Sequence, residues 1–264
     1  MIFDTHAHYD DEAFAGDCDE LISNLINQNV EAVVNVGANI EGSRASLLLA
    51  QKHSCVYAAI GVHPSEVEEL DDAKLTWIGD TAKENAIYNG GKVVAIGEIG
   101  LDYYYPDPAI DIQKEYFEKQ IEIARDVKLP MIIHSRDAAK DTYDILSAHK
   151  AEQLGGIIHC YSYSKEMARD YLDMGFYFGI GGVLTFKNAR KLVETVEYLP
   201  MDSIVLETDS PYLAPVPKRG ERNDSSNIRF VVQKISELKN ISEDEVVRIT
   251  CENAKKVYGI NANT

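Results

Sequence analysis

Two histidines near the start of the chain, His6 and His8, are separated by a single residue and follow the apolar pair Ile2–Phe3. On an extended strand, side chains two positions apart point the same way, so both imidazoles could face one cation. A pair of surface histidines is the ordinary alternative, because an isolated His-x-His motif is common. The pair therefore indicates a metal site only if other ligands come from elsewhere in the chain.

Further residues of the types that bind metals follow other short apolar runs. Glu98 follows 93–96, His134 follows 131–133, His159 follows 156–158, and Asp209 comes shortly after 204–206. Taken singly, either carboxylate could cap a helix, and either histidine could be a hydrogen-bonded core residue. Together with the first pair they supply four histidines and two carboxylates. That set suffices for two divalent cations held about 3.5–4 Å apart by a bridging carboxylate.

The elements that must position these residues alternate along the chain. Short apolar runs occur at Ile2–Phe3, Ala32–Val36, Val56–Val62, Val93–Ile96, Met131–Ile133, Gly156–Ile158, Phe176–Ile180 and Ile204–Leu206. Segments with helical spacing lie between the later runs, at 113–127, 141–149, 165–172 and 188–196. Short buried runs separated by helices indicate a parallel sheet. Eight such units predict an α/β protein folded as a single (β/α)8 TIM-type barrel, for which about 250 residues is typical.

Additional C-terminal helices are expected after the eighth strand, within one domain that spans residues 1–264. Two helices are predicted from about Ser226 onward. Ser242 and Glu245 have the spacing of a capping box at the start of the second helix, and Gly259 lies where that helix would end.

The barrel prediction brings the candidate residues together. The carboxyl ends of barrel strands converge on one face, where active sites are built. Five of the seven histidines lie at predicted strand ends, including His63 after 56–62. We therefore expect one polar, metal-binding mouth.

The composition limits the classes of partner. With 26 Lys and Arg against 43 Asp and Glu, the formal net charge is −17, and such a surface repels a phosphate backbone. Nucleic-acid chemistry would need local positive charge from cations and a few basic residues. A secretory signal, a membrane span and a disulfide framework are not evident from the sequence. We expect a cytoplasmic protein, without an obligate protein partner.

Six segments carry a resemblance to a known family. They are Asp4-Thr-His6-Ala-His8, Gly61-Val-His63-Pro64, Gly97-Glu98-Ile-Gly-Leu-Asp102, His134-Ser-Arg136, His159-Cys-Tyr161 and Glu207-Thr-Asp209-Ser-Pro-Tyr212. In this order they resemble the TatD family of metal-dependent deoxyribonucleases, relatives of the amidohydrolase superfamily, from residue 2 to about 258. One segment, 219–226, departs from the family pattern, because Glu-Pro would ordinarily follow Asn223; this leaves the local backbone of that loop in question.

The resemblance implies a particular set of ligands. The first metal would be bound by His6, His8 and Asp209, with Glu98 bridging to the second. The second metal would take Glu98, His134 and His159. Zn²⁺, Mn²⁺ and Mg²⁺ are the candidate cations, because four imidazoles favour softer transition metals while carboxylates and water accommodate Mg²⁺.

Four residues are predicted to take part in catalysis with a metal-activated water. Glu98 would bridge the cations, and Asp209 is the candidate general base. Glu207 could orient a metal ligand or could be an ordinary polar residue of the barrel interior. His63 could donate a hydrogen bond to the substrate phosphate or leaving group, or could be structural.

Substrate contacts are predicted from the remaining basic and aromatic residues. Arg136 and Arg222 could bind phosphate with paired N–H groups, or could form surface ion pairs. Tyr104, in the run Tyr103–Tyr105, could stack on a base of single-stranded nucleic acid or form part of a lid. Cys160 is interpreted as a buried thiol and not as a nucleophile.

The function that follows is hydrolysis of phosphodiester bonds, as in a TatD-like deoxyribonuclease of the 3′–5′ exonuclease type. Single-stranded DNA or another phosphodiester is the expected substrate. One alternative is a metal-dependent hydrolase of amides, lactones or small phosphoesters. A second alternative is a barrel that binds metal without catalysis.

Overall fold

The computed structural model describes residues 1–260. Its strands are β1 (Ile2–Ala7), β2 (Val30–Val36), β3 (Val56–Ile60), β4 (Val93–Asp102), β5 (Met131–Arg136), β6 (Gly156–Ile158), β7 (Tyr177–Ile180) and β8 (Ile204–Leu206). Within the described range these eight strands are parallel and pair in chain order, β1 with β2 through to β7 with β8. All eight predicted strands are therefore confirmed.

The sheet curls into a nearly closed barrel. Beyond the end of β8, Ala7 and Ser210 form a parallel bridge. The amide of Asp209 donates to the carbonyl of His6 at 2.9 Å, and the amide of His8 donates to Ser210 at 2.8 Å. The first strand therefore meets the segment after the last one, which confirms the barrel prediction.

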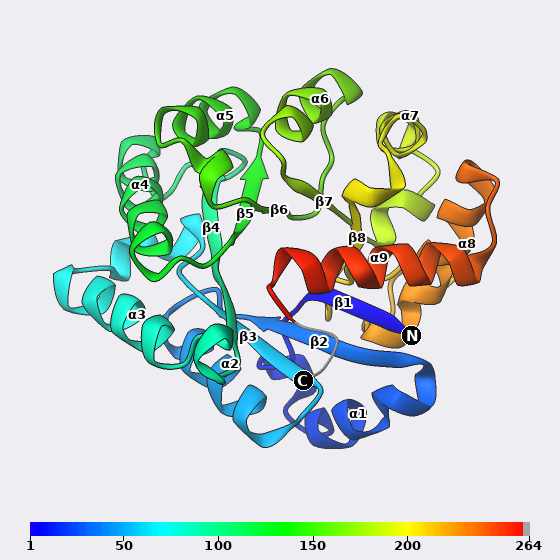
Figure 1. The fold of residues 1–264 in the computed structure, drawn as a ribbon, viewed down its shortest axis with the longest axis horizontal. Helices are drawn as coiled ribbons and strands as arrows, with labels where there is room; N and C mark the ends of the chain where they lie inside the picture. The colour runs from blue at the N-terminus through cyan, green and yellow to red at the C-terminus, as the bar shows by residue number, and fades with distance from the viewer. Residues whose placement is uncertain (261–264) are drawn as a thin grey trace.

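All the helices except the last form a ring around the strands (Figure 1). The helices are α1 (Cys18–Asn24), α2 (Ile40–Lys52), α3 (Asp72–Glu84), α4 (Ile110–Val127), α5 (Ala139–Ala148), α6 (Lys165–Asp173), α7 (Arg190–Tyr198), α8 (Ile228–Lys239) and α9 (Glu243–Val257). The four predicted inter-strand helices and the two C-terminal ones are confirmed. Helices α1 to α3 were not identified from the spacing of apolar residues. Asn39 and Asp71, whose side chains cap α2 and α3, were the available signals.

The ends of α9 follow the sequence prediction. The amide of Glu245 donates to Ser242 Oγ at 3.2 Å, which is half of the expected capping box. Gly259 lies just past the helix with φ of 66°, a left-handed conformation that glycine adopts without strain.

The interior of the barrel is a second apolar core. Buried residues from seven strands meet there, among them Val34, Ala59, Ile132, Ile157 and Val205. Because side chains alternate across a strand, the residues two positions after Ile132, Ile157 and Val205 point into the same interior nearer the carboxyl ends. The apolar filling thus gives way to polar side chains at one end of the barrel.

Helix α9 closes the opposite end of the barrel. Cys251, Ala254 and Tyr258 of this C-terminal region belong to the interior core. In Figure 1, α9 crosses in front of the strands.

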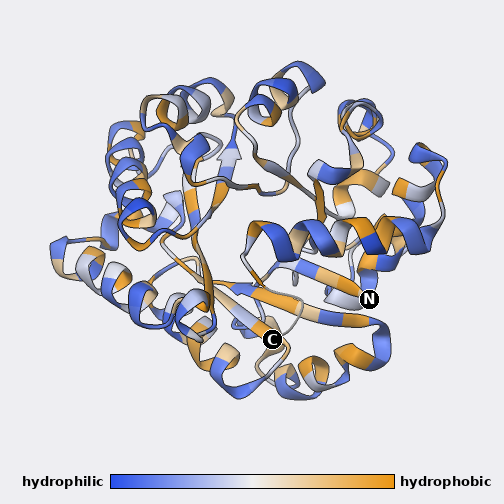
Figure 2. Ribbon diagram, in the orientation of Figure 1, coloured by the Kyte–Doolittle hydropathy of each residue, from blue (hydrophilic) through white to orange (hydrophobic). Residues whose placement is uncertain are grey.

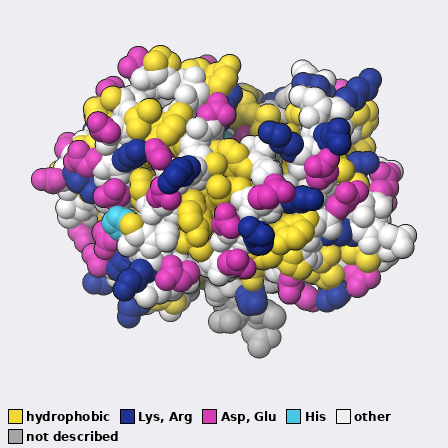
Figure 3. All heavy atoms as spheres, turned by 90° about the horizontal axis from the view of Figure 1, so that it is seen from above, with side chains coloured by type: hydrophobic (Ala, Val, Ile, Leu, Met, Phe, Trp, Pro, Cys, Tyr) yellow, Lys and Arg dark blue, Asp and Glu magenta, His cyan; other side chains and the backbone are white. Residues whose placement is uncertain are grey.

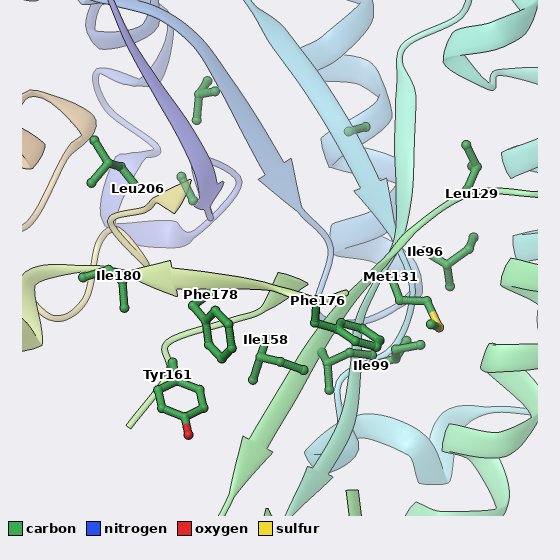
Figure 4. Close-up of a cluster of buried hydrophobic side chains, with 14 of the residues drawn as sticks. Ile96, Ile99, Leu129, Met131, Ile158, Tyr161, Phe176, Phe178, Ile180 and Leu206 are labelled. Atoms are coloured by element: carbon green, nitrogen blue, oxygen red, sulfur yellow. The ribbon is translucent and has the colours of Figure 1, made fainter. Parts of the chain in front are cut away.

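The outer core lies between the strands and the helices. Hydrophobic residues concentrate on the strands and on the helix sides that face them, while hydrophilic residues face outward (Figure 2). Acidic, basic and apolar side chains are interspersed over the face drawn in Figure 3. Figure 4 shows part of this core, where Phe176 and Phe178 lie near Ile158 and Tyr161. The rings of Phe178 and Tyr161 meet edge to face with centroids 5.1 Å apart.

Candidate metal centre

His6 lies in β1 and His8 directly follows that strand. Both face two carboxylates, Glu98 and Asp209, at the mouth of the barrel. His6 Nε2 lies 3.4 Å from Glu98 Oε2 and 3.8 Å from Asp209 Oδ1. His8 Nε2 lies 3.8 Å and 3.5 Å from the same two oxygens. The ligand atoms of His6, His8 and Asp209 form a group close enough to bind one cation.

The strands β5 and β6 bring two more histidines to Glu98. His134 Nδ1 lies 2.7 Å from Glu98 Oε1, and His159 Nε2 lies 3.7 Å from the same oxygen. Glu98 therefore has one oxygen toward the β1 histidines and the other toward His134 and His159. This arrangement suits a carboxylate that bridges two cations.

In two of the histidines, Nδ1 points away from the centre, and its hydrogen-bond partner shows which ring nitrogen carries the proton. His8 Nδ1 lies 2.8 Å from the carbonyl oxygen of Val36, so this nitrogen carries the proton. His159 Nδ1 lies 3.2 Å from Glu207 Oε2 and donates to that carboxylate. In the neutral form of both rings, Nε2 therefore holds the lone pair, and this is the form that binds a metal.

The spacing of His6 and His8 is also suited to a cation. Their Nε2 atoms are 3.1 Å apart. Two nitrogens at about 2.0–2.1 Å from a tetrahedral cation would be separated by roughly 3.3 Å. Across residues 1–260, His6 Nδ1 has no hydrogen-bond partner. The donor set of buried imidazoles and carboxylates therefore fits divalent transition metals.

His63 has the opposite tautomer and is not suited to be a ligand. Its Nδ1 accepts from the amide of Ser65 at 3.1 Å. Burial, together with the neighbouring His134, lowers the pKa of His63 to about 3, so the ring is neutral near pH 7. The proton must then lie on Nε2, 3.8 Å from Glu98 Oε1. His63 is a hydrogen-bond donor pointing into the centre.

The carboxylates of the centre are ionised although they are buried. Burial raises the pKa of Glu98, but the surrounding His159, His63 and His6 hold it well below its usual range. Burial likewise raises the pKa of Asp209, and its hydrogen bond with His8 and the nearby histidines bring the net value down. For His8, burial lowers the pKa, but Asp209 and Glu98 outweigh it and raise the pKa to about 9. Cations that bind here must displace such protons.

A cavity of about 590 Å³ opens above the centre, and Arg136, Tyr105 and Tyr212 line it together with the candidate ligands. The Arg136 guanidinium lies 3.8 Å from the ring centroid of Tyr104 and 5.7 Å from that of Tyr105. Among residues 1–260, no carboxylate forms an ion pair with Arg136. The mouth therefore combines buried carboxylates with an arginine that can accept an anion.

Comparison with known proteins agrees with this geometry. The family model described as TatD related DNase matches residues 3–259. The chain belongs to the TatD family. It is 42% identical over 261 residues to the uncharacterized metal-dependent hydrolase YabD of Bacillus subtilis, covering 99% of this chain and 100% of that protein. The uncharacterized metal-dependent hydrolase YcfH of Escherichia coli is 34% identical over 266 residues, with coverage of 100% and 97%.

A solved structure of a TatD homologue has the same fold. The crystal structure of YjjV from Escherichia coli superposes with a TM-score of 0.90 at 29% identity, covering 98% of each chain. With its TatD relatives, the chain is a metal-dependent hydrolase. In the described part of the chain, every helix is too short or too polar to span a bilayer.

The other TatD site residues predicted from the sequence lie in different surroundings. Arg222 donates two hydrogen bonds to the carboxylate of Asp17, at 2.9 and 2.6 Å, and lies over the ring of Phe14. This is the surface ion pair that was the alternative for Arg222, whereas its contact with substrate stays a prediction. Tyr104 is exposed and stacks on Arg136.

Glu207 and Cys160 are joined beside the centre. Glu207 is buried and accepts from His159 through one oxygen and from the amide of Cys160 through the other, at 2.7 Å. Burial raises the pKa of the Cys160 thiol well above its usual range. A thiol kept protonated is a poor nucleophile, which fits the interpretation of Cys160 as unreactive.

Sequence reasoning did not single out two polar residues that support the site. Asp102 Oδ2 lies 3.2 Å from His134 Nε2. Asn223 is buried and donates to the carbonyls of Thr208 and Tyr212 at 3.0 and 2.8 Å, which holds the loop after β8. Asp102 is the last residue of the segment Gly97–Asp102, so its position after a predicted strand could have identified it as a residue of the site. Asp209 caps no helix, since the residues directly after it form irregular structure.

Proposed function

We propose that this TatD protein hydrolyses phosphodiester bonds with two divalent cations, and that single-stranded DNA is its substrate class. The proposal is supported by the side chains that meet at the mouth of the barrel. Four histidines and two ionised carboxylates converge there beside an arginine that can bind an anion. A neutral substrate such as a lactone would leave that arginine without a partner. The family name, TatD related DNase, supports the same substrate class.

The contacts between the candidate ligands support the proposed cation positions. His6, His8 and Asp209 would hold one cation, His134 and His159 the other, and Glu98 would bridge them. Bound in this way, the cations would lower the pKa of a water and offset negative charge on the phosphoryl group. Zn²⁺, Mn²⁺ and Mg²⁺ all remain candidates.

The proton transfers are assigned to residues at the mouth. Asp209 is ionised, and its Oδ1 lies 3.8 Å from both His6 Nε2 and His159 Nε2, so it is placed to accept the proton of a water in the centre. His63 Nε2–H would donate to a phosphate oxygen or to the leaving oxygen. Glu207 would fix the ring of His159 without touching the substrate.

The substrate contacts are assigned to the rim. The Arg136 guanidinium would bind a phosphate oxygen pair edge-on while the ring of Tyr104 supports its face. The exposed tyrosines beside it could stack on unpaired bases.

We infer a single domain over residues 1–264 and a cytoplasmic location. All four cysteines are free thiols, which fits a reducing compartment.

The test is a substrate panel on protein stripped by chelator and reconstituted with Mn²⁺. We expect cleavage of an end-labelled single-stranded oligonucleotide and of a small phosphodiester, and weak or undetectable hydrolysis of a lactone. Asp209→Asn should lower kcat about 10²–10⁴-fold, the range for loss of a general base. Asp144→Asn, on the exposed face of α5, is the matched control. Hydrolysis of the lactone alone would defeat the proposal.

A further inference from the structure

Asp102 at the end of β4 is a buried carboxylate whose two oxygens serve two different partners. Its side chain is 7% exposed. Oδ2 lies 3.2 Å from His134 Nε2, and Oδ1 accepts from the amide of Tyr104 at 2.9 Å. One residue thus contacts both a candidate metal ligand and the loop that carries the exposed tyrosines.

The fold fixes the position of Asp102 independently of the centre. Its amide donates to Gln113 Oε1 at 2.9 Å, and Gln113 Nε2 donates back to its carbonyl at 2.9 Å. Gln113 is buried in α4 and also binds the carbonyl of Pro108. In the sheet, Asp102 is the register partner of Arg136 on β5. The carboxylate therefore lies on a rigid frame formed by β4, β5 and α4.

The contact with His134 decides which ring nitrogen faces the centre. Because an ionised carboxylate only accepts hydrogen bonds, His134 Nε2 must carry the proton. Nδ1 lies 2.7 Å from Glu98 Oε1, a second ionised carboxylate, so this nitrogen also donates here. A cation bound by Nδ1 would take the place of that proton, while Asp102 would keep the proton on Nε2. Hydrogen-bonded partners of this kind orient metal-binding histidines and raise their basicity.

Asp102 also contacts the loop that lies beside the proposed substrate cavity. By accepting from the amide of Tyr104, Asp102 holds the start of the loop after β4. The ring of Tyr104 lies over the Arg136 guanidinium at 3.8 Å. Loss of that hydrogen bond would release the ring that supports Arg136 at the mouth.

We propose that Asp102 is a positioning residue that orients His134 toward the second cation and holds the Tyr104 loop against Arg136. The inference deepens the proposed function, because it rests on the two-cation centre. It assigns to one carboxylate both the retention of a cation and the geometry of the phosphate contact.

The decisive variant is Asp102→Asn. The backbone N–H of Tyr104 would donate to the side-chain oxygen of the new asparagine. The asparagine NH₂ group would then face His134 Nε2. That group needs an acceptor, which would move the ring proton to Nδ1, the atom that binds the cation. We expect one of the two Mn²⁺ equivalents to bind about 10–100-fold more weakly by calorimetry, with the other unchanged. Because Asp102→Asn keeps the hydrogen bond to the Tyr104 amide, KM for the oligonucleotide at saturating Mn²⁺ should stay near the wild-type value, whereas Asp102→Ala, which loses that bond as well, should raise it.

Tyr104→Ala separates the two roles. It removes the ring over Arg136 but keeps the amide and His134, so both Mn²⁺ equivalents should bind as in the wild type while KM rises. A variant-free measurement is ¹⁵N NMR of the wild type loaded with Zn²⁺, which is diamagnetic; it should find the His134 proton on Nε2. This measurement stands even if Asp102→Asn does not fold.

Three outcomes overturn the inference: a Zn²⁺-loaded protein in which His134 Nε2 carries no proton, two unweakened Mn²⁺ equivalents in a folded Asp102→Asn protein, or loss of an equivalent in Tyr104→Ala. A wild type that binds two Mn²⁺ but cleaves no phosphodiester would defeat the proposed function. The role of Asp102 toward His134 would still be supported by the selective loss of one equivalent.

Discussion

Two arginines that looked equivalent in the sequence differ in what they contact. Arg136 stacks on Tyr104 at the mouth, whereas Arg222 already satisfies its charge on Asp17. An arginine in a bidentate ion pair has to give up that partner before it binds a phosphate. The side chain that is free of a carboxylate is the better anion site.

A pair of single variants tests this difference. We expect Arg136→Ala to raise KM for an anionic substrate about tenfold, the size of one charge-assisted hydrogen bond. Arg222→Ala should raise KM less than Arg136→Ala does, because the Arg222 side chain is already bound to the carboxylate of Asp17. Steady-state kinetics on an oligonucleotide with Mn²⁺ give both values. A larger KM effect in Arg222→Ala would reverse the assignment and place the phosphate contact on that loop.

Which residues gather at the site was predictable, whereas their partners were not. Ligand types at strand ends converge in any barrel, so His134 and His159 could be placed together from the sequence. Their hydrogen-bond partners, Asp102 and Glu207, come from different strands, and only the packed barrel shows which oxygen meets which ring. For the same reason, the tautomer of His63 depends on a turn amide, that of Ser65, which no spacing rule identifies.

Strands β4 and β5 extend beyond the apolar runs that predicted them. The runs ended at Ile96 and Ile133, but the ladder continues through the pairs Gly100–His134 and Asp102–Arg136. Hydropathy follows the environment of side chains, while a strand is defined by its backbone hydrogen bonds. Polar residues that face the centre therefore ended the predicted strands early, and they lie within the ladder, where the backbone holds them rigidly.

The C-terminal helix is expected to contribute strongly to stability because it closes the barrel. Tyr258, which follows α9, is 1% exposed, packs on Phe3 and donates to the carbonyl of Thr5 at 2.9 Å. Tyr258→Ala should lower the free energy of unfolding by about 3–5 kcal/mol, as for other buried aromatic truncations. Tyr258→Phe should cost only about 1 kcal/mol, one hydrogen bond. Urea denaturation of the metal-free protein measures both, and equal costs would contradict a packing role.

At the scale of the whole molecule, the charge opposes a polyanionic substrate. The net charge is −17, and the face in Figure 3 intersperses acidic with basic side chains without a continuous basic stripe. Proteins that bind DNA through many phosphate contacts release many counterions and lose affinity steeply with salt. On the proposed function, we expect the attraction to come from the mouth, from Arg136 and the proposed cations. Binding of a long strand should therefore depend on the few phosphates that enter the cavity.

Salt dependence tests this confinement. For single strands, each phosphate neutralised by a basic side chain lowers log affinity by about 0.7 per tenfold rise in salt. With Arg136 as the one basic contact, KM for an oligonucleotide should rise no more than about fivefold per tenfold increase in KCl at fixed Mn²⁺. Screening of the acidic surface acts in the opposite direction and should flatten the slope further. Lengthening the oligonucleotide should leave the slope unchanged, because added phosphates stay outside the cavity. A slope that steepens with length would reveal a basic track along the surface and would contradict binding confined to the mouth.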